Sequence, residues 1–294
     1  MAEGMELRYC LITPAYNEEA NLPGLFESVR AQTIQPVCWV IVNDGSDDGT
    51  GRLIDDFAEQ VGYVEPVHLG RDKVETYYSR KIFAFSEGYR KLAACCNDYG
   101  FLGNLDADIA MPPDYYEKVL GSFAANPRLG IAGGGYVYEG TAYAPLLHAD
   151  TVPGSILMFR RECYEAVGGY LPLRYGAEDT LACVMARTEG WEVELLSDCD
   201  VVQRRVVGMA ENNGILKARF RQGLSEYDIG YHPLFTFVKF VRRCFRERPF
   251  VIGSFARYLG YLCGPLVARS RMGPPRARNT LRREQLRRVF HAFK

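Results

Sequence analysis

The sequence of 294 residues lacks the short signatures of several enzyme classes. It has no Gly-rich Walker loop and no G-x-G-x-x-G motif after a predicted strand, which argues against P-loop nucleotidases and dinucleotide dehydrogenases. The G-x-S-x-G elbow of α/β-hydrolases is also missing. We find no internal repeat and no low-complexity segment, and 48% hydrophobic and 24% charged residues are an ordinary globular composition. The chain is therefore expected to fold around a conventional core.

The nine cysteines do not form a recognisable pattern. No C-x-x-C pair occurs, so the spacing of a zinc site is absent, and the adjacent Cys95 and Cys96 do not suit a disulfide framework. No basic-then-apolar signal sequence opens the chain, and the longest apolar stretch, 249–268, is interrupted by Arg257. We expect a protein of a reducing, cytoplasmic compartment without a membrane-spanning helix.

The net charge of −1 conceals an uneven distribution. Residues 239–294 contain 15 Lys and Arg but only two acids, a net charge of +13, which leaves −14 on residues 1–238. Such a basic, aromatic-rich tail predicts contact with an anionic surface. A peripheral helix on anionic lipid at the inner membrane face and a packed helical subdomain both fit the pattern. Nucleic acid is a further alternative, although no recognised nucleic-acid-binding module is visible.

Short apolar runs alternate with helical patterns in the first third of the chain. The runs at 8–13, 37–42, 63–68 and 101–105 predict strands, and the patterns at 18–32, 48–61 and 79–96 predict helices. This alternation predicts an α/β fold with a parallel sheet. After residue 108 the pattern is mixed, with expected helices at 112–125, 161–167 and 178–189 and strands at 130–138, 152–160, 191–196 and 201–206. Beyond about residue 211 the chain reads as helical.

Three polar clusters follow predicted strands, at 13–18, 43–46 and 106–108. Each one alone could be ordinary turn chemistry, but ligands of parallel sheets bind where the carboxyl ends of strands meet. Asp106 and Asp108 could converge on one hard cation, and Mg²⁺ or Mn²⁺ prefers such oxygen ligands. A solvated turn with an aspartate as helix N-cap is the simpler alternative for this pair.

Six segments together resemble the family 2 glycosyltransferases, which have the GT-A fold. They are 11–19, 40–50, 105–108, 154–161, 167–170 and 176–179, in order and with similar spacing over about residues 7–206. The resemblance implies a Rossmann-like nucleotide-binding half at about 7–108 and a mixed α+β acceptor half at 109–230. These form one domain, 1–230, which a basic, aromatic-rich helical extension follows at 231–294.

The resemblance also implies roles for individual residues. The nucleotide-sugar donor would be bound by Pro14, Ala15, Tyr16, Glu18, Asp44, Arg80, Asp106, Ala107 and Asp108. Mn²⁺ or Mg²⁺ would be held by Asp108 and Asp106, and Asp179, with Glu178 beside it, would be the catalytic base. The sequence departs from the family at Asn43, where Asp is usual, and near Gln203, where a His is often found.

The implied activity is a metal-dependent, inverting transfer of a sugar from a nucleotide-diphosphate donor. We expect a UDP-sugar, because a carboxylate at Asp44 suits the N3–H of uracil, and a hydroxyl acceptor on a glycan or lipid-linked glycan, as in polysaccharide biosynthesis. A sugar-phosphate nucleotidyltransferase is the alternative enzyme, but the first-strand loop lacks its Gly-rich sequence. Three minor expectations remain. The glycine run 133–135 could let the backbone approach the donor sugar or could form a turn or bulge. Three tyrosines, Tyr136, Tyr138 and Tyr143, could stack on an acceptor sugar, and Arg204 or Arg205 could neutralise the leaving diphosphate.

Overall fold

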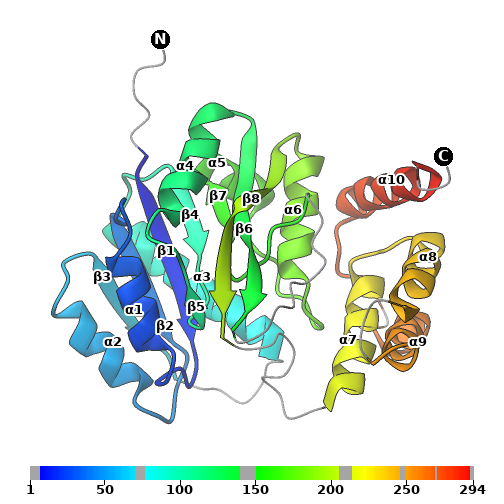
Figure 1. The fold of residues 1–294 in the computed structure, drawn as a ribbon, viewed down its shortest axis with the longest axis horizontal. Helices are drawn as coiled ribbons and strands as arrows, with labels where there is room; N and C mark the ends of the chain where they lie inside the picture. The colour runs from blue at the N-terminus through cyan, green and yellow to red at the C-terminus, as the bar shows by residue number, and fades with distance from the viewer. Residues whose placement is uncertain are drawn as a thin grey trace.

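The computed structural model describes residues 7–70, 77–139, 150–204, 214–245, 249–268 and 270–291. An eight-stranded mixed sheet forms its centre (Figure 1), in the order β3-β2-β1-β4-β7-β6-β8-β5. The strands are β1 (Tyr9–Ala15), β2 (Cys38–Asn43), β3 (Val64–His68), β4 (Phe101–Asn104), β5 (Ile109–Ala110), β6 (Leu129–Tyr138), β7 (Met158–Arg160) and β8 (Glu192–Gln203). The helices are α1 (Leu22–Arg30), α2 (Thr50–Ala58), α3 (Tyr77–Cys95), α4 (Tyr115–Ala125), α5 (Arg161–Val167), α6 (Glu178–Thr188), α7 (Gly214–Asp228), α8 (Pro233–Cys244), α9 (Ile252–Val267) and α10 (Pro275–His291).

Both faces of the sheet are buried, as the continuous apolar runs predict. Along β1, Tyr9 and Leu11 pack into one core with α1, α2 and α4, whereas Cys10 and Ile12 pack into a second core with α3, α5 and α6. This alternation follows from the two-residue period of a strand. The sheet is therefore a rigid layer between two sets of helices, and its strand ends are fixed in position.

The parallel strands β1, β2 and β4 end at one edge of the sheet. Ile12 pairs with Asn104 and Ala15 pairs with Asn43, so the three following loops leave the sheet close together. The four strands and three helices expected in this half are all present, although α1 and α2 begin and end two to four residues inside their predicted ranges and α3 begins two residues before its range. The three polar clusters thus meet at one edge, as the sequence predicts.

The second half differs from the sequence expectation in three places. Only Met158–Arg160 of the strand expected at 152–160 is a strand, because the chain before it hydrogen-bonds to the loop after β4 instead. The two strands expected at 191–196 and 201–206 are one strand, β8, whose register shifts between Gly134 and Tyr136 of β6. The two-residue strand β5 had no sequence signal, because such a short segment has no detectable period.

The position of β5 shows that the sheet is curled. Only four residues lie between the end of β4 and the start of β5, yet three strands separate the two in the sheet order. Ile109 of β5 pairs with Gln203 at the end of β8. The segment 105–108 therefore bridges the two halves and carries Asp106 and Asp108 across the gap between them.

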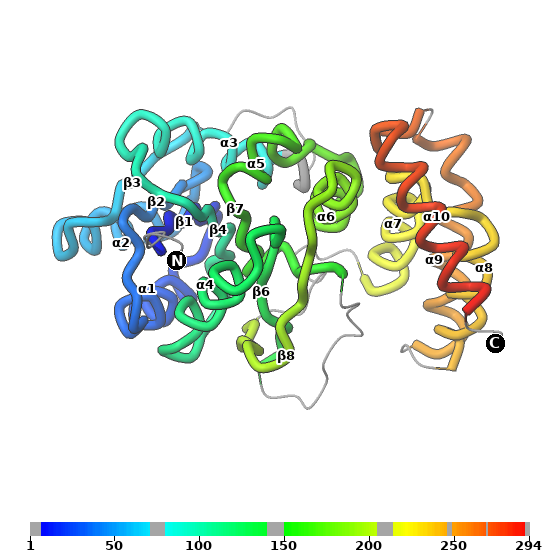
Figure 2. The backbone as a smooth tube through the Cα atoms, turned by 90° about the horizontal axis from the view of Figure 1, so that it is seen from above, coloured from blue at the N-terminus to red at the C-terminus, as the bar shows by residue number. Residues whose placement is uncertain are grey.

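Helices α7–α10 lie together at one end of the molecule, beside the sheet and its helices (Figures 1 and 2). A third apolar cluster joins them to α6 and includes Leu181, Val184, Ile229 and Leu281. Arg187 of α6 also forms an ion pair of 2.8 Å with Glu284 of α10. Within the described ranges no helix is both long and apolar enough to cross a bilayer.

Candidate active site

The loop after β1 is tied to the loop after β2 by side-chain hydrogen bonds. The Glu18 N–H donates to the Thr50 hydroxyl over 2.8 Å, and the Asn17 N–H donates to the Ser46 hydroxyl over 3.0 Å. Asn17 has a φ of 53°, a left-handed conformation that asparagine tolerates. This turn orients the segment that contains the predicted nucleoside-binding residues Pro14, Ala15, Tyr16 and Glu18.

Asp44 and Arg80 form the best-defined pair of the site. The Arg80 Nε atom lies 3.0 Å and 2.9 Å from the two Asp44 carboxylate oxygens, and an Arg80 terminal nitrogen lies 2.8 Å from Oδ1. Both side chains are largely buried, since 12% of the Arg80 side chain and 8% of the Asp44 side chain are exposed. A bidentate pair of this kind fixes both groups in direction. The two residues that the resemblance assigned to the nucleotide therefore act as one unit.

Asp106 and Asp108 have different partners despite their proximity in sequence. The Lys81 ammonium lies 2.7 Å from an Asp106 carboxylate oxygen. Asp108 is buried, and its carboxylate accepts a long hydrogen bond of 3.5 Å from the Gln203 amide. Ala107 between them is buried in the core of the sheet. Asp108 is thus the better placed of the two carboxylates to bind a cation, because a lysine already neutralises Asp106.

Two residues that contact Asp106 and Asp108, Asn104 and Gln203, also carry amide oxygens that suit a hard divalent cation. Within the described part of the chain, the buried Gln203 Oε1 and Asn104 Oδ1 atoms have no hydrogen-bond partner. The same residues contain no group of three or more His, Cys, Asp and Glu that could hold a metal ion. Carboxylate and amide oxygens with open positions for phosphate oxygens are nevertheless the environment that Mg²⁺ prefers. The residues present therefore fit Mn²⁺ or Mg²⁺ with Asp108 as the central ligand.

A chain of hydrogen bonds joins Asp179 to the loop after β4. The Gly154 N–H donates to an Asp179 carboxylate oxygen over 3.0 Å, and the Gly154 carbonyl accepts from the Asn104 amide. The Asp106 N–H donates to the Ser155 carbonyl over 2.8 Å. The carboxylate at the start of α6 and the two aspartates after β4 are therefore brought to the same region.

Glu178 has the electrostatic character of an acid–base group. Burial first, and then the neighbouring Asp179 carboxylate, raise the pKa of Glu178 to about 7, while Lys81 opposes the shift. A carboxyl group that titrates near neutral pH can both accept and release a proton under working conditions.

Two residues to which the resemblance gave no role, Lys81 and Gln203, also lie in the candidate site, beside Asp106 and Asp108. The only sequence signal for Lys81 was its place beside Arg80 at the start of a helix.

The minor expectations have mixed outcomes. A Cβ on Gly134 would lie 1.6 Å from the Cys199 carbonyl oxygen, so the glycine run serves the bulge against β8. Asn43, where the family usually has Asp, contacts His68 over 3.2 Å. Arg204 packs over Gly24 of α1. Arg205 and Tyr143 lie outside the described residues.

A curled α/β sheet with the Asp44–Arg80 ion pair after β2 and with Asp106 and Asp108 after β4 has the architecture of a GT-A glycosyltransferase. Comparison with known families agrees, since residues 10–168 match the description "Glycosyl transferase family 2". The chain therefore belongs to glycosyl transferase family 2. The fold class, the family and the enzyme class predicted from the sequence are confirmed, and the nucleotidyltransferase alternative is set aside.

Similar proteins share parts of this architecture. Polyprenol monophosphomannose synthase of Mycolicibacterium smegmatis is 33% identical over 135 residues, which are 46% of this chain and 47% of that protein. The chain thus matches about half the length of this relative. The mannosyltransferase PcManGT of Pyrobaculum calidifontis, solved with GDP-Man and Mn²⁺, has a TM-score of 0.57 and 18% identity, over 97% of this chain and 75% of its own. TarS 1–349 of S. aureus, solved with UDP-GlcNAc, has a TM-score of 0.56 and 14% identity, over 74% and 65%.

Proposed function

We propose that this protein transfers a sugar from a nucleoside-diphosphate donor to polyprenyl phosphate, with inversion and with the help of Mn²⁺ or Mg²⁺. Membership of glycosyl transferase family 2 carries the proposal of sugar transfer. The name of the mycobacterial relative supports a polyprenol monophosphate acceptor and a mannosyl group. The Mn²⁺ in the structure of the mannosyltransferase PcManGT supports a divalent cation.

Each part of the site has a defined task in this reaction. Pro14, Ala15, Tyr16 and Glu18 line the nucleoside, and the Asp44–Arg80 pair presents oriented hydrogen-bonding groups to its base. Asp106, with Lys81, faces the ribose and diphosphate, and Asp108 would hold the cation, with Asp106 as the second carboxylate near it. When bound, the cation stabilises the negative charge that develops on the departing diphosphate.

The identity of the donor nucleotide depends on which nucleobase the Asp44–Arg80 pair binds. The sequence favours uracil, since the Asp44 carboxylate can accept a hydrogen bond from the N3–H group. The named relatives include a GDP-Man complex and a UDP-GlcNAc complex. We therefore propose UDP-sugars and GDP-mannose as the two donor classes that a binding screen separates.

The acceptor oxygen determines whether a catalytic base is needed. The phosphate group of polyprenyl phosphate has a second pKa near 6, as other phosphate monoesters have, so its oxygen is already anionic at neutral pH. A hydroxyl group must lose a proton during transfer and needs a base. The Glu178–Asp179 pair, with the pKa of Glu178 raised to about 7, favours a second candidate function, which is transfer to a hydroxyl of a lipid-linked glycan.

A transfer assay tests the proposal. The purified protein is incubated with Mn²⁺, a radiolabelled UDP- or GDP-sugar and one of three lipids: polyprenyl phosphate, the dephosphorylated polyprenol, or a lipid-linked disaccharide. We expect a solvent-extractable labelled lipid with polyprenyl phosphate and none with polyprenol. Label in the disaccharide lipid alone would establish the second candidate. No product from any donor, with donor binding intact, would contradict both acceptors.

A further inference from the structure

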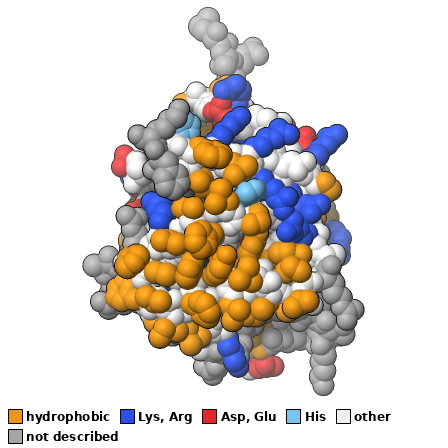
Figure 3. Space-filling model, turned by 90° about the vertical axis from the view of Figure 1, so that its right-hand side faces the viewer, with side chains coloured by type: hydrophobic (Ala, Val, Ile, Leu, Met, Phe, Trp, Pro, Cys, Tyr) orange, Lys and Arg blue, Asp and Glu red, His pale blue; other side chains and the backbone are white. Residues whose placement is uncertain are grey.

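The outward faces of α8 and α9 are apolar along their whole length. On α9 the exposed residues recur every three or four positions, at Ile252, Phe255, Leu259, Leu262 and Leu266, and Leu266 is 84% exposed. On α8 the same spacing exposes Leu234, Phe237 and Val241, and Phe245 follows with 79% exposure. We call these nine side chains the outer apolar face. Figure 3 shows the apolar side chains gathered on this end of the molecule.

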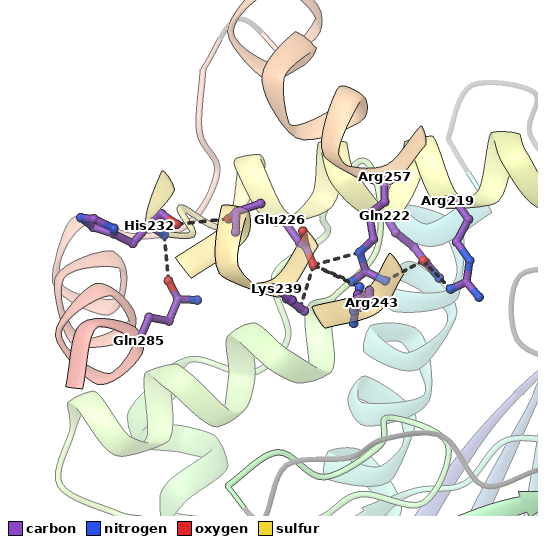
Figure 4. Close-up of polar contacts among 9 residues, drawn as sticks. Arg219, Gln222, Glu226, His232, Lys239, Arg243, Arg257 and Gln285 are labelled. Carbon is purple, nitrogen blue, oxygen red and sulfur yellow. Dashed lines mark hydrogen bonds and ion pairs between the residues drawn. The ribbon is translucent and has the colours of Figure 1, made fainter. Parts of the chain in front are cut away.

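Three charged side chains of the two helices, Lys239, Arg243 and Arg257, point the opposite way, into the bundle (Figure 4), whereas Arg242 of α8 is exposed. The carboxylate of Glu226 on α7 lies 2.8 Å from the Lys239 ammonium and 2.6 Å from the Arg257 guanidinium, and Arg243 lies 3.9 Å away. Burial alone would raise the pKa of Glu226, but these three cations hold it well below its usual range. The bundle is therefore ionic inside and apolar outside, the reverse of an ordinary surface helix.

The contact between α7 and α9 is made by glycines. A Cβ on Gly260 would lie 2.0 Å from the Phe220 carbonyl oxygen, and one on Gly223 would lie 1.8 Å from the Arg257 carbonyl oxygen. Gly264 packs in the same way against the Tyr227 ring. Helices that associate within lipid use small residues at their contacts, because they gain nothing by turning large apolar side chains inward. The large apolar residues of α9 are accordingly on the outside.

We propose that the outer apolar face is immersed in the hydrocarbon of one leaflet of a lipid bilayer. Monomeric proteins rarely expose a contiguous apolar patch of this extent to water. A basic border accompanies it, since Arg276, Arg283 and Arg287 are exposed on one side of α10. Figure 3 shows Lys and Arg side chains along the upper edge of this face, where they suit lipid phosphates. An apolar centre with a cationic border is complementary to a lipid surface.

This mode of attachment differs from the one that the charge of the tail suggested. Lys239, Arg243 and Arg257 belong to the 15 cations of the tail, yet all three surround Glu226. The attachment should therefore come chiefly from apolar burial and depend little on salt. Its link to catalysis rests on the proposed function, since immersion would bring the site to a lipid acceptor, but the binding itself does not depend on it.

Vesicle flotation of the full chain tests the proposal. We expect the protein to float with phosphatidylcholine vesicles and with vesicles containing phosphatidylglycerol, and to remain bound at about 0.5 M salt, where charges are screened. Leu262→Glu and Leu266→Glu should each lower the partition coefficient by about tenfold or more, from the cost of losing one buried leucine. The control Arg52→Gln with Gln60→Glu, on and beside α2, changes the net charge by −2 far from this face, as the Leu262→Glu and Leu266→Glu double variant does, and should not change partitioning.

Three results would overturn immersion. The protein could stay at the bottom of the gradient with both vesicle types, or it could float only with anionic vesicles and dissociate in salt, which would show attraction by charge alone. Light scattering could instead show a dimer that the two glutamate substitutions abolish, and a second copy would then cover the face. Donor binding by the Leu262→Glu and Leu266→Glu double variant, followed by calorimetry, should equal that of the unchanged protein. This separates a failure of immersion from a failure of the proposed transfer activity.

Discussion

Asp106 and Asp108 are two residues apart, but their surroundings give them different chemistry. Lys81 forms an ion pair with Asp106, whereas Asp108 is buried and accepts a long hydrogen bond from the Gln203 amide nitrogen. The sequence alone could not distinguish the two carboxylates, because their difference depends on α3 and β8.

Replacing Asp108 with Asn should abolish Mn²⁺-dependent donor binding and leave the fold intact. Removing one anionic ligand weakens the hold on a hard cation, while the amide keeps the size of the side chain. Calorimetric titration of the donor, with and without Mn²⁺, measures the effect. Asp114→Asn, at a half-buried acid before α4 that pairs with Lys118, is the matched control. Undiminished metal-dependent binding in the Asp108 variant would contradict the assignment.

The consequence of Asp179→Asn depends on the acceptor. With a hydroxyl acceptor, loss of the base should lower kcat by roughly 10²–10⁴-fold. With polyprenyl phosphate the fall should stay within about tenfold, since the attacking oxygen is already ionised and the asparagine oxygen can still accept from Gly154. Donor binding should survive in both cases. Measuring kcat with both acceptors tests this difference. Equal losses of kcat with the two acceptors would contradict the role of Asp179 as a base that only the hydroxyl acceptor needs.

At the scale of elements, the sequence predicted the first half of the fold well and the second half less well. Strands such as β1 and β2 are continuous apolar runs with polar ends, so local pattern alone identifies them. The run expected at 152–160 is a strand only at β7, where β4 and β6 offer partners, and the two-residue β5, which pairs with β8, has no local signal. The residues that the family motif named are gathered at one edge, whereas Lys81 and Gln203 required the tertiary structure.

The glycine contact between α7 and α9 predicts a sharp difference between two similar substitutions. Gly260→Ala should lower the free energy of unfolding by about 2–3 kcal/mol, because the new Cβ would collide with the Phe220 carbonyl and overpack the contact. Gly121→Ala on α4 meets nothing within 4 Å and should stabilise by about 0.5 kcal/mol. Thermal denaturation followed by circular dichroism compares them. Similar effects of the two would mean that α7 and α9 are not in close contact.

At the scale of the whole molecule, the active site should make stability depend on pH. The pKa of Glu178 is about 7 in the folded protein, well above the usual value for a glutamate. Between about pH 4.5 and 7 the folded state binds more protons than the unfolded state, so stability should fall as pH rises through this window. Above about pH 7 Glu178 is ionised in both states, so the loss of stability has reached its full size.

Glu178→Gln should remove this dependence. At pH 8 the free energy of unfolding of the variant should exceed that of the unchanged protein by up to about 3 kcal/mol, so the variant should unfold at a higher temperature. At pH 5 the two proteins should unfold at nearly the same temperature. Thermal melts at the two pH values measure it without metal or donor. A variant that is destabilised equally at both pH values would show that Glu178 is ionised and well solvated in the fold.

The bridge formed by residues 105–108 bears on any attempt to divide the protein. A fragment ending at residue 108 would contain the first-strand loop, the Asp44–Arg80 pair and both aspartates, and from its sequence it looks like a complete nucleotide-binding unit. It would lack β7, leaving one edge of β4 without a neighbour, and it would lack Gln203 beside Asp108. Unpaired edges of this kind invite aggregation. The proposed donor site thus needs strands from both halves of the sheet, and residues 7–108 should be kept joined to the rest of the sheet in any fusion, permutation or domain exchange.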